Sequence, residues 1–321
     1  MNANYRFPIP IELGLKNPLY FEVNNPSDLG IKNVWIRVNL PDAIRCTSPH
    51  IRIGDIGPNS SGTAHIAFIP TSTSKVDFGH FDLYFELESR KYIKEKLPLG
   101  KHEIECSYLL VDSVLAAPLK FGLELPLAIN LENHFPQPLT DVQVKCFFSK
   151  GIDFDTDTFK INSLASGFVQ PLNINILPKS TKISKIGYFN VNFMLDDNYC
   201  HIPRVEFEKS ELILPELHIR LNIPDVFYKD MPATIGIIVE NRSDELLSNV
   251  CFSSCFPSFV DCQLPKTCIA EIQLGASRYA AIDLKPNVSG KVNFGNLNIS
   301  FEVNGILCQK EPIDLGTYNV A

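Results

Sequence analysis

The 321-residue sequence lacks several features that would place it in a familiar functional class. No apolar run approaches the roughly 18 residues that a membrane-spanning helix needs. The opening segment Met1–Arg6 lacks the basic stretch and apolar core of a signal peptide. Basic residues are too few for a nucleic-acid coat, with 29 Lys and Arg against 36 Asp and Glu and a net charge of −7. We therefore expect neither membrane insertion nor nucleic-acid binding.

Motifs for catalysis and for cofactors are also missing. The sequence contains no Gly-x-Ser-x-Gly elbow, phosphate-binding glycine loop or dinucleotide fingerprint. The acidic segment 153–157 resembles the start of a calcium loop, but Thr158 and Leu164 stand where such a loop needs Gly and Glu. We expect a non-enzyme without a metal or cofactor.

What the sequence does contain is a repeat of 108 residues. Asn25, Asn133 and Asn241 are separated by this interval, and each ends a short apolar run. The same spacing relates two further sets of residues: Pro70, Pro178 and Pro286, and Gly79, Gly187 and Gly295. A register kept over so many positions predicts three successive domains, at residues 1–108, 109–216 and 217–321.

Each repeat shows the alternation of half-buried β-strands. Apolar side chains at 81, 83, 85 and 87 alternate with other residues, and segments 189–195 and 297–303 repeat this pattern. Asn304-Gly305 after the last of these segments favours a tight hairpin turn. No segment carries a convincing helical stripe. We therefore predict an all-β protein with three tandem immunoglobulin-like antiparallel β-sandwich domains.

The turn and core residues of the repeat resemble those of a known group of domains. The relevant stretches are 23–38, with its Val-x-Asn turn followed by Asn-Val-x-Ile-x-Val, and the later segments 53–58, 68–70 and 79–83. In these the chain is similar to tandem CARDB and NEW3-type immunoglobulin-like domains. The resemblance implies the sandwich fold and a role as an adhesion, scaffold or accessory module.

The segments between repeats are short and apolar. Residues 103–111 and 212–219 contain no Gly/Ser-rich tether, so one strand leads almost directly into the next. Such junctions predict limited hinge motion. Strands of about ten residues, plus end loops, would make each domain roughly 40 Å long and a stacked rod on the order of 120 Å.

The nine cysteines suggest a compartment. Their number is odd, and we interpret them as scattered independently of the repeat, which favours a reducing, cytoplasmic environment. Four of them, Cys251, Cys255, Cys262 and Cys268, lie close together in the third repeat. Because their spacing lacks a Cys-x-x-Cys knuckle, we favour free or buried thiols, with a metal site or a disulfide as alternatives.

Trp35, the only tryptophan, is the first candidate binding residue. It lies between Val34 and Ile36, which should face the core, so its own side chain should point outward. Tryptophan is enriched at the energetic centres of interfaces. We interpret Trp35 as a contact for a protein partner, the alternative being that a neighbouring strand or domain covers it.

The second candidate is a basic hairpin in the first repeat. The segment 90–96 supplies the candidate binding residues Arg90, Lys91, Tyr92, Lys94 and Lys96. A basic strand on an acidic protein could attract an acidic partner, although an ordinary solvated strand would look the same.

The sequence is thus best interpreted as a non-enzymatic scaffold or spacer. It would bind protein partners through sandwich loops, edge strands and the Trp35 surface. The alternative is an extracellular carbohydrate-binding or adhesive stalk.

Overall fold

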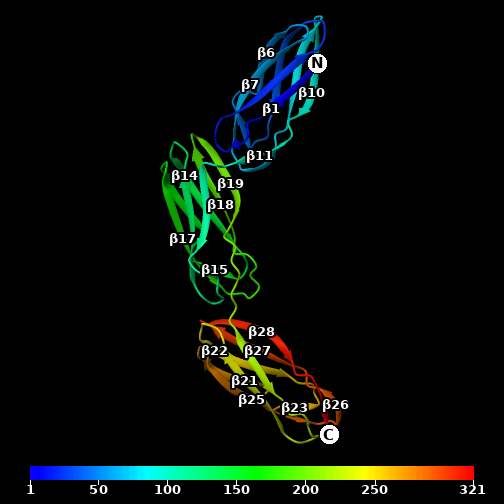
Figure 1. Ribbon diagram of the computed structural model, residues 1–321, viewed down its shortest axis with the longest axis vertical. Helices are drawn as coiled ribbons and strands as arrows, with labels where there is room; N and C mark the ends of the chain where they lie inside the picture. The colour runs from blue at the N-terminus through cyan, green and yellow to red at the C-terminus, as the bar shows by residue number, and fades with distance from the viewer.

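The computed structural model describes residues 1–321 and consists of strands, turns and connecting segments. The strands form three sandwiches that follow one another along a rod, with the two chain termini at opposite ends (Figure 1). We call them sandwich 1, 2 and 3, in chain order. No helix is present that could cross a membrane.

The strands of each sandwich follow the repeat. Sandwich 1 contains β1 (Asn2–Arg6), β2 (Ile11–Glu12), β3 (Asn17–Asn25), β4 (Ile31–Asn39), β5 (Ile44–Cys46), β6 (His50–Ile56), β7 (Ser60–Pro70), β8 (Ser74–Asp77), β9 (His80–Leu87), β10 (Arg90–Pro98) and β11 (Lys101–Glu105). Sandwich 2 contains β12 (Leu109–Leu115), β13 (Leu125–Asn133), β14 (Leu139–Phe148), β15 (Ile152–Phe154), β16 (Thr158–Leu164), β17 (Val169–Pro178), β18 (Gly187–Leu195) and β19 (Asn198–Glu206). Sandwich 3 contains β20 (Leu217–Asn222), β21 (Ala233–Asn241), β22 (Leu247–Cys255), β23 (Val260–Asp261), β24 (Lys266–Ile272), β25 (Ser277–Pro286), β26 (Gly290–Asn293), β27 (Asn296–Val303), β28 (Ile306–Asp314) and β29 (Thr317–Val320).

Two four-stranded sheets pack in each sandwich, in the same order each time. In sandwich 1 the orders are β1-β3-β7-β5 and β10-β9-β4-β6. The counterparts are β12-β13-β17-β15 with β19-β18-β14-β16, and β20-β21-β25-β23 with β28-β27-β22-β24. The strands within these sheets are antiparallel. This is the immunoglobulin-like arrangement, as the sequence predicted.

The core comes from the predicted alternating positions. On β9, Phe81 and Leu83 are fully buried, as are their counterparts Phe189 and Val191 on β18. One apolar cluster runs through sandwiches 1 and 2, and a second fills sandwich 3. The second cluster includes Phe121, a residue of sandwich 2, so the cores meet across the domain junctions.

The repeated asparagine fastens a turn between the two sheets. The buried Asn133 donates from Nδ2 to the carbonyl oxygens of Gln137 (3.1 Å) and Leu164 (2.9 Å), and its Oδ1 accepts the Phe135 N–H. Asn25 and Asn241 make the corresponding bonds in the other sandwiches. Since buried amide groups must be paired, this geometry explains why Asn recurs.

The repeated glycines mark a close approach of two backbone segments. A Cβ atom on Gly79 would lie 2.3 Å from the carbonyl oxygen of Asn39, and the positive φ of 75° also favours glycine. Gly187 and Gly295 meet the carbonyl oxygens of Phe147 and Cys255 in the same way. Only a residue without a side chain fits there.

The junction between sandwiches 1 and 2 is formed by a hairpin that rests on a glycine. The β18–β19 hairpin of sandwich 2 brings Leu195 and Cys200 against Gly14, where a Cβ atom would lie 2.7 Å from Leu195 Cδ2 and 3.1 Å from Cys200 Sγ. Arg45 of sandwich 1 donates from Nη1 to the Asp197 carbonyl oxygen and to Asn198 Oδ1, both at 3.1 Å. Leu195, Asn198 and Cys200 are buried at this junction, while Asp196 and Asp197 at the hairpin tip stay exposed.

The junction between sandwiches 2 and 3 uses the same parts. The β27–β28 hairpin places Val303 against Gly122, whose added Cβ would lie 2.9 Å from the Val303 carbonyl oxygen. Asn304 Nδ2 donates to the Gly122 carbonyl oxygen at 3.0 Å. Lys120 pairs with Asp244 at 2.7 Å, and this bond raises the pKa of Lys120 and lowers that of Asp244.

Some cysteines recur at equivalent positions of the repeat, contrary to our prediction. Cys200 and Cys308 occupy the same repeat position, which lies at the junction end of each hairpin, and Cys46 and Cys262 share another position. Our interpretation of the nine as unrelated to the repeat was therefore wrong for these two pairs. Cys200 and Cys308 are buried, so packing accounts for their recurrence.

We expect Asn133→Ala to lower the free energy of unfolding of the protein by about 3 kcal/mol, because buried backbone groups lose their partners. Asn130→Ala removes an amide bonded to Asp112 at the surface and should cost less than about 1 kcal/mol. Chemical denaturation followed by far-UV circular dichroism measures the free energy of unfolding of the two variants. Equal stability of the two variants would contradict the role given to Asn133.

Candidate functional site

Trp35 lies on the outer face of the β10-β9-β4-β6 sheet of sandwich 1. Its neighbours Val34 and Ile36 are fully buried, whereas Trp35 itself is half-buried, so the predicted outward orientation is confirmed. The indole stacks on Tyr84 of β9, with ring centroids 3.7 Å apart and planes inclined by 3°. The ring of His50 on β6 lies 5.6 Å from it. A same-sheet neighbour therefore covers part of the indole.

A row of side chains crosses this face from edge to edge. Strand register places Arg52, Trp35, Tyr84 and Ile93 side by side on β6, β4, β9 and β10. We call this row, together with its neighbours Asn33, Arg37, His50 and Lys91, the Trp35 face. A shallow pocket of about 390 Å³ opens beside the indole, lined by Asn33, Trp35, His50, Ile51 and Arg52.

The cations of the Trp35 face have no acidic partners. Glu86 accepts a hydrogen bond from Asn33 Nδ2 at 2.9 Å, and Asp82 accepts one from the Lys96 backbone N–H at 2.9 Å. None of the six ion pairs of the protein involves a residue of sandwich 1. The exposed Arg37, Arg52 and Lys91 side chains therefore remain available to an acidic partner.

The structure divides the predicted basic hairpin between two surfaces. Lys91 pairs in register with Glu86 and lies on the Trp35 face. Tyr92 has the opposite phase, stacks on Phe85 with centroids 5.3 Å apart, and is 41% exposed. Lys94 Nζ donates to the Met1 carbonyl oxygen. Tyr92 and Lys94 are therefore directed away from Trp35.

The remaining two candidates lie at the ends of β10. Arg90 opens the strand next to the hairpin tip and is exposed. Lys96 sits in a bulge with a φ of 54°, between residues 94 and 97. The five candidates of the basic hairpin thus do not form one continuous patch.

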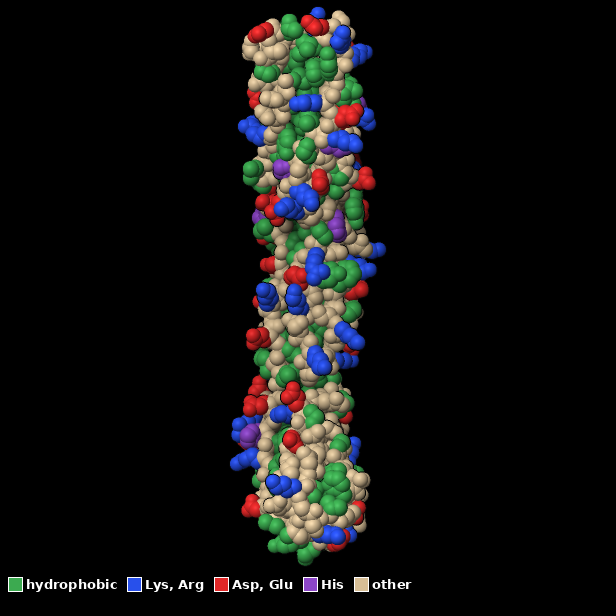
Figure 2. Space-filling view, turned by 90° about the vertical axis from the view of Figure 1, so that its right-hand side faces the viewer, with side chains coloured by type: hydrophobic (Ala, Val, Ile, Leu, Met, Phe, Trp, Pro, Cys, Tyr) green, Lys and Arg blue, Asp and Glu red, His purple; other side chains and the backbone are tan.

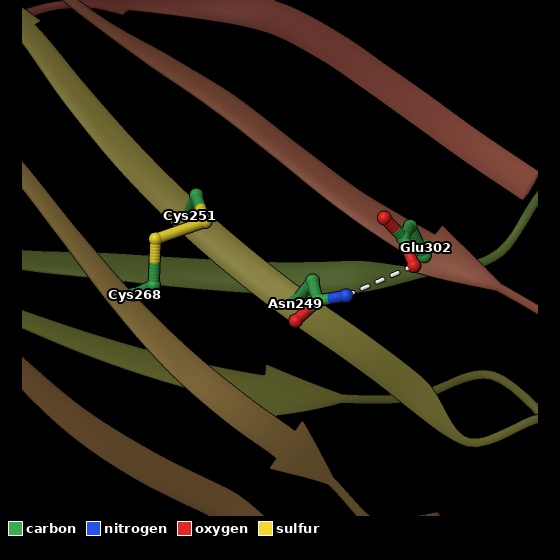
Figure 3. Close-up of a disulfide and its surroundings, with 4 residues drawn as sticks. All are labelled: Asn249, Cys251, Cys268 and Glu302. Carbon is green, nitrogen blue, oxygen red and sulfur yellow. Dashed lines mark hydrogen bonds between the residues drawn. A yellow bond between two sulfur atoms is a disulfide. The ribbon is translucent and has the colours of Figure 1, made fainter. Parts of the chain in front are cut away.

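In the other two sandwiches, different residues occupy the positions of Trp35 and Arg52, although sandwich 3 keeps the hydrogen bond beside them. Asn249 donates to Glu302 in sandwich 3 at 2.9 Å, as Asn33 does to Glu86 in sandwich 1 (Figure 3). At the positions of Trp35 and Arg52, however, sandwich 3 has Cys251 and Cys268, which form a disulfide between β22 and β24 (Figure 3). Sandwich 2 has Gln143 and Lys160 in register there. The aromatic and cationic centre is specific to sandwich 1.

The disulfide corrects our preference for free or buried thiols in the third repeat. Cys251 and Cys268 are direct cross-strand partners with a Cα–Cα distance of 4.1 Å, which brings the two outward side chains together. Cys255 and Cys262 remain free. No group of three or more His, Cys, Asp or Glu side chains is arranged to hold a metal ion.

Three other cysteines have thiols of low reactivity. Burial raises the pKa of Cys106 to about 11 and those of Cys146 and Cys200 to about 12. Thiolates, the reactive form, are therefore scarce at these positions near neutral pH. Cys255 is the exposed free thiol.

Sequence reasoning missed Tyr84, Arg52 and His50 as parts of the face. Tyr84 carried a signal, because it alternates with the inward residues Leu83 and Phe85 on β9. Arg52 and His50 carried none, since their position beside Trp35 depends on the pairing of β4 with β6, which the pattern of a single strand does not reveal.

Comparisons with known proteins define no family. No family model matches the chain, and no curated protein sequence matches it. Similar solved structures include alpha-2-macroglobulin of E. coli, with 10% identity, a TM-score of 0.31, and coverage of 99% of this chain and 23% of that one. A marsupial T cell receptor has 11% identity and a TM-score of 0.30, with coverage of 98% of this chain and 100% of the receptor.

Red sea bream transglutaminase is a further similar structure, with 10% identity, a TM-score of 0.26, and coverage of 75% of this chain and 37% of the enzyme. This chain therefore spans about a quarter of the macroglobulin and over a third of the transglutaminase. Similarity at this level assigns no activity to the chain.

The thiol content gives a direct test of the disulfide. Alkylation of the unfolded, unreduced protein should modify seven cysteines, and alkylation after reduction should modify all nine. Mass spectrometry counts the added groups, and peptide mapping should find Cys251 and Cys268 among those protected. Nine modified cysteines without reductant would contradict the bond.

Proposed function

We propose that the chain is a non-enzymatic scaffold or spacer that binds a protein partner through the Trp35 face. The observation that carries this proposal is the row formed by Arg52, Trp35, Tyr84 and Ile93, flanked by cations without ion pairs. Tryptophan, tyrosine and arginine are the residues most enriched at interface hot spots. An acidic segment of a partner would complement this surface.

The shape of the protein supports a spacing role. Figure 2 shows a narrow rod with Lys and Arg side chains interspersed among Asp and Glu side chains on the visible face. The junctions described above bury the residues that flank the hairpin tips, namely Leu195, Cys200, Val303 and Cys308, which favours limited motion between the sandwiches. A partner held at sandwich 1 would therefore keep a defined distance from anything held at sandwich 3.

The edges of the β10-type strands are less suited to binding by strand addition. Strands β10 and β19 carry bulges at Lys96 and Arg204, each with a positive φ, and β28 has Pro312 at the same repeat position. Bulges, lysines and prolines protect sheet edges from pairing with another chain. The proposal therefore places the main contact on the flat face rather than on these edges.

The alternative proposal, a carbohydrate-binding or adhesive stalk, has less support from the geometry. A sugar ring packs on an open aromatic face, but one face of the Trp35 indole is already stacked on Tyr84. The general likeness to CARDB and NEW3-type modules suits both proposals, since such modules serve in adhesion and as scaffolds.

The free and the disulfide-bonded cysteines point to different cellular compartments. Seven free thiols support the proposed cytoplasmic location, whereas the Cys251–Cys268 disulfide favours an oxidising environment. The thiol count described above, made on protein from its source, decides between them.

Trp35→Ala should weaken partner binding by about 2 kcal/mol, or roughly 30-fold, while leaving the melting temperature nearly unchanged. A matched control is Tyr279→Ala, which removes an aromatic side chain that is 63% exposed on sandwich 3. Affinity capture from source lysate with the wild type and both variants, followed by titration of the captured protein, measures the effect.

A partner retained equally by all three proteins would refute the role of Trp35. Glycan binding that is lost in Trp35→Ala, with no protein captured by the wild type, would replace the scaffold proposal with the alternative.

A further inference from the structure

The loop that receives a hairpin at each junction is built in all three sandwiches. In sandwich 1 the Leu13 N–H donates to the Glu105 carbonyl oxygen at 2.8 Å, and the Gly14 N–H donates to that of Pro70 at 2.9 Å. Phe121 and Gly122 repeat these bonds to Ile213 and Pro178. Lys229 and Asp230 repeat them again to Ala321 and Pro286. Sandwich 3 therefore has a complete receiving loop at the free end of the rod.

The side chains of this third loop differ from those of the two occupied loops. Leu13 and Phe121 are buried at the junctions, whereas Lys229 is exposed in the same position. Asp230 replaces the glycine and keeps its left-handed backbone, with a φ of 58°. By equivalence, its Cβ stands at the position that is left free on Gly14 and Gly122, where Leu195 and Val303 pack. Sandwich 3 therefore cannot receive a hairpin in the same manner.

The opposite end of the rod shows the complementary feature. The β9–β10 hairpin of sandwich 1 is equivalent to the two hairpins that form the junctions, but no other sandwich of the chain packs against it. Leu87, Phe85 and Tyr92 are partly exposed there, and Tyr92 reaches 41%. Their counterparts at the first junction, Leu195, Phe193 and Cys200, are fully buried. The hairpin of sandwich 1 thus has the form of a junction hairpin, but no apolar residue of a neighbouring domain covers it.

We propose that this free end of sandwich 1 is a docking surface for the end of another β-sandwich domain. The occupant would present an apolar residue followed by a glycine in a left-handed turn, as Leu13-Gly14 and Phe121-Gly122 do within this chain. This surface differs from the Trp35 face, and the inference does not depend on the proposed function. Continuity with the two internal junctions is the basis for the choice of occupant.

The charge of the residues at the free end of sandwich 1 indicates which charge the docking domain should carry. At the first junction Arg45 contacts Asn198, and the residue equivalent to Asn198 at the free end is Arg90. An acidic residue at the position of Arg45 would therefore complement the exposed Arg90. The occupant should be an acidic sandwich end.

A second copy of this chain meets only part of this requirement. Its sandwich 3 has Asp261 at the position of Arg45, which suits Arg90. Lys229 and Asp230, however, would place two charges in the apolar slot around Leu87, at a large cost of desolvation. These two residues thus prevent copies of the chain from joining head to tail. If they are replaced, sandwich 3 of one copy can be used to test binding to the free end of sandwich 1 of another copy.

The test uses the full-length double variant Lys229→Phe/Asp230→Gly, which copies Phe121-Gly122. Sedimentation velocity should show association that grows with concentration, with a weight-average mass that rises by about twofold or more, because a head-to-tail contact is heterologous. The wild type and the single variant Lys229→Phe, which keeps Asp230, should remain monomeric. Added wild-type chain should shorten the assemblies, since it offers a free sandwich 1 but no receiving loop.

Two further variants place the contact. Leu87→Glu, added to the double variant, should abolish association, whereas Trp35→Ala should leave it intact. Unchanged melting temperatures verify that each variant is folded. A double variant that stays monomeric would overturn the proposal, as would association that survives Leu87→Glu or is equally strong in Lys229→Phe.

Discussion

The close approach of a hairpin tip to a glycine determines the form of this protein. At both junctions the glycine lies in a left-handed turn, and a single added carbon would lie within 3 Å of the neighbouring sandwich. The absence of a side chain lets Leu195 and Val303 pack where a longer residue would hold the domains apart. Burial at the first junction accompanies a single apolar cluster through sandwiches 1 and 2, and at the second junction Phe121 of sandwich 2 joins the separate cluster of sandwich 3. The rod shape follows from this contact.

The repeat separates residues that maintain the fold from those that are free to vary. Asn25 and its equivalents hydrogen-bond the same backbone groups three times, and Gly79 and its equivalents allow the same close backbone approach three times. Between these fixed points, one outer face carries Trp35 and Arg52, another Gln143 and Lys160, and the third a disulfide. The shared backbone contacts thus keep one fold in all three domains, while the chemistry of the outer face differs from one sandwich to the next.

Periodicity and spacing in the sequence were sufficient to predict the sandwiches, since alternation and turn residues are local properties of a strand. The outward direction of Trp35 followed from the same alternation. The neighbours of Trp35 did not, because the pairing of β4 with β6 includes register shifts between residues 31 and 35 that no single strand encodes. The Cys251–Cys268 bond depends on the same kind of pairing. The 108-residue spacing already aligned Asp230 with Gly14 and Gly122, but only the structure shows that these glycines lie at the junctions.

The most direct test of this account is solution X-ray scattering of Gly14→Val/Gly122→Val beside the control Gly167→Val/Gly275→Val. All four glycines have a positive φ, between 67° and 74°, but nothing lies within 4 Å of a Cβ on Gly167 or Gly275. Both variants therefore carry similar backbone strain, and only the first adds a clash at the junctions. The account predicts a wild-type-like rod for the control and a broader distribution of interdomain distances for the junction variant. Identical scattering from the two variants would show that the glycine contacts do not hold the rod together.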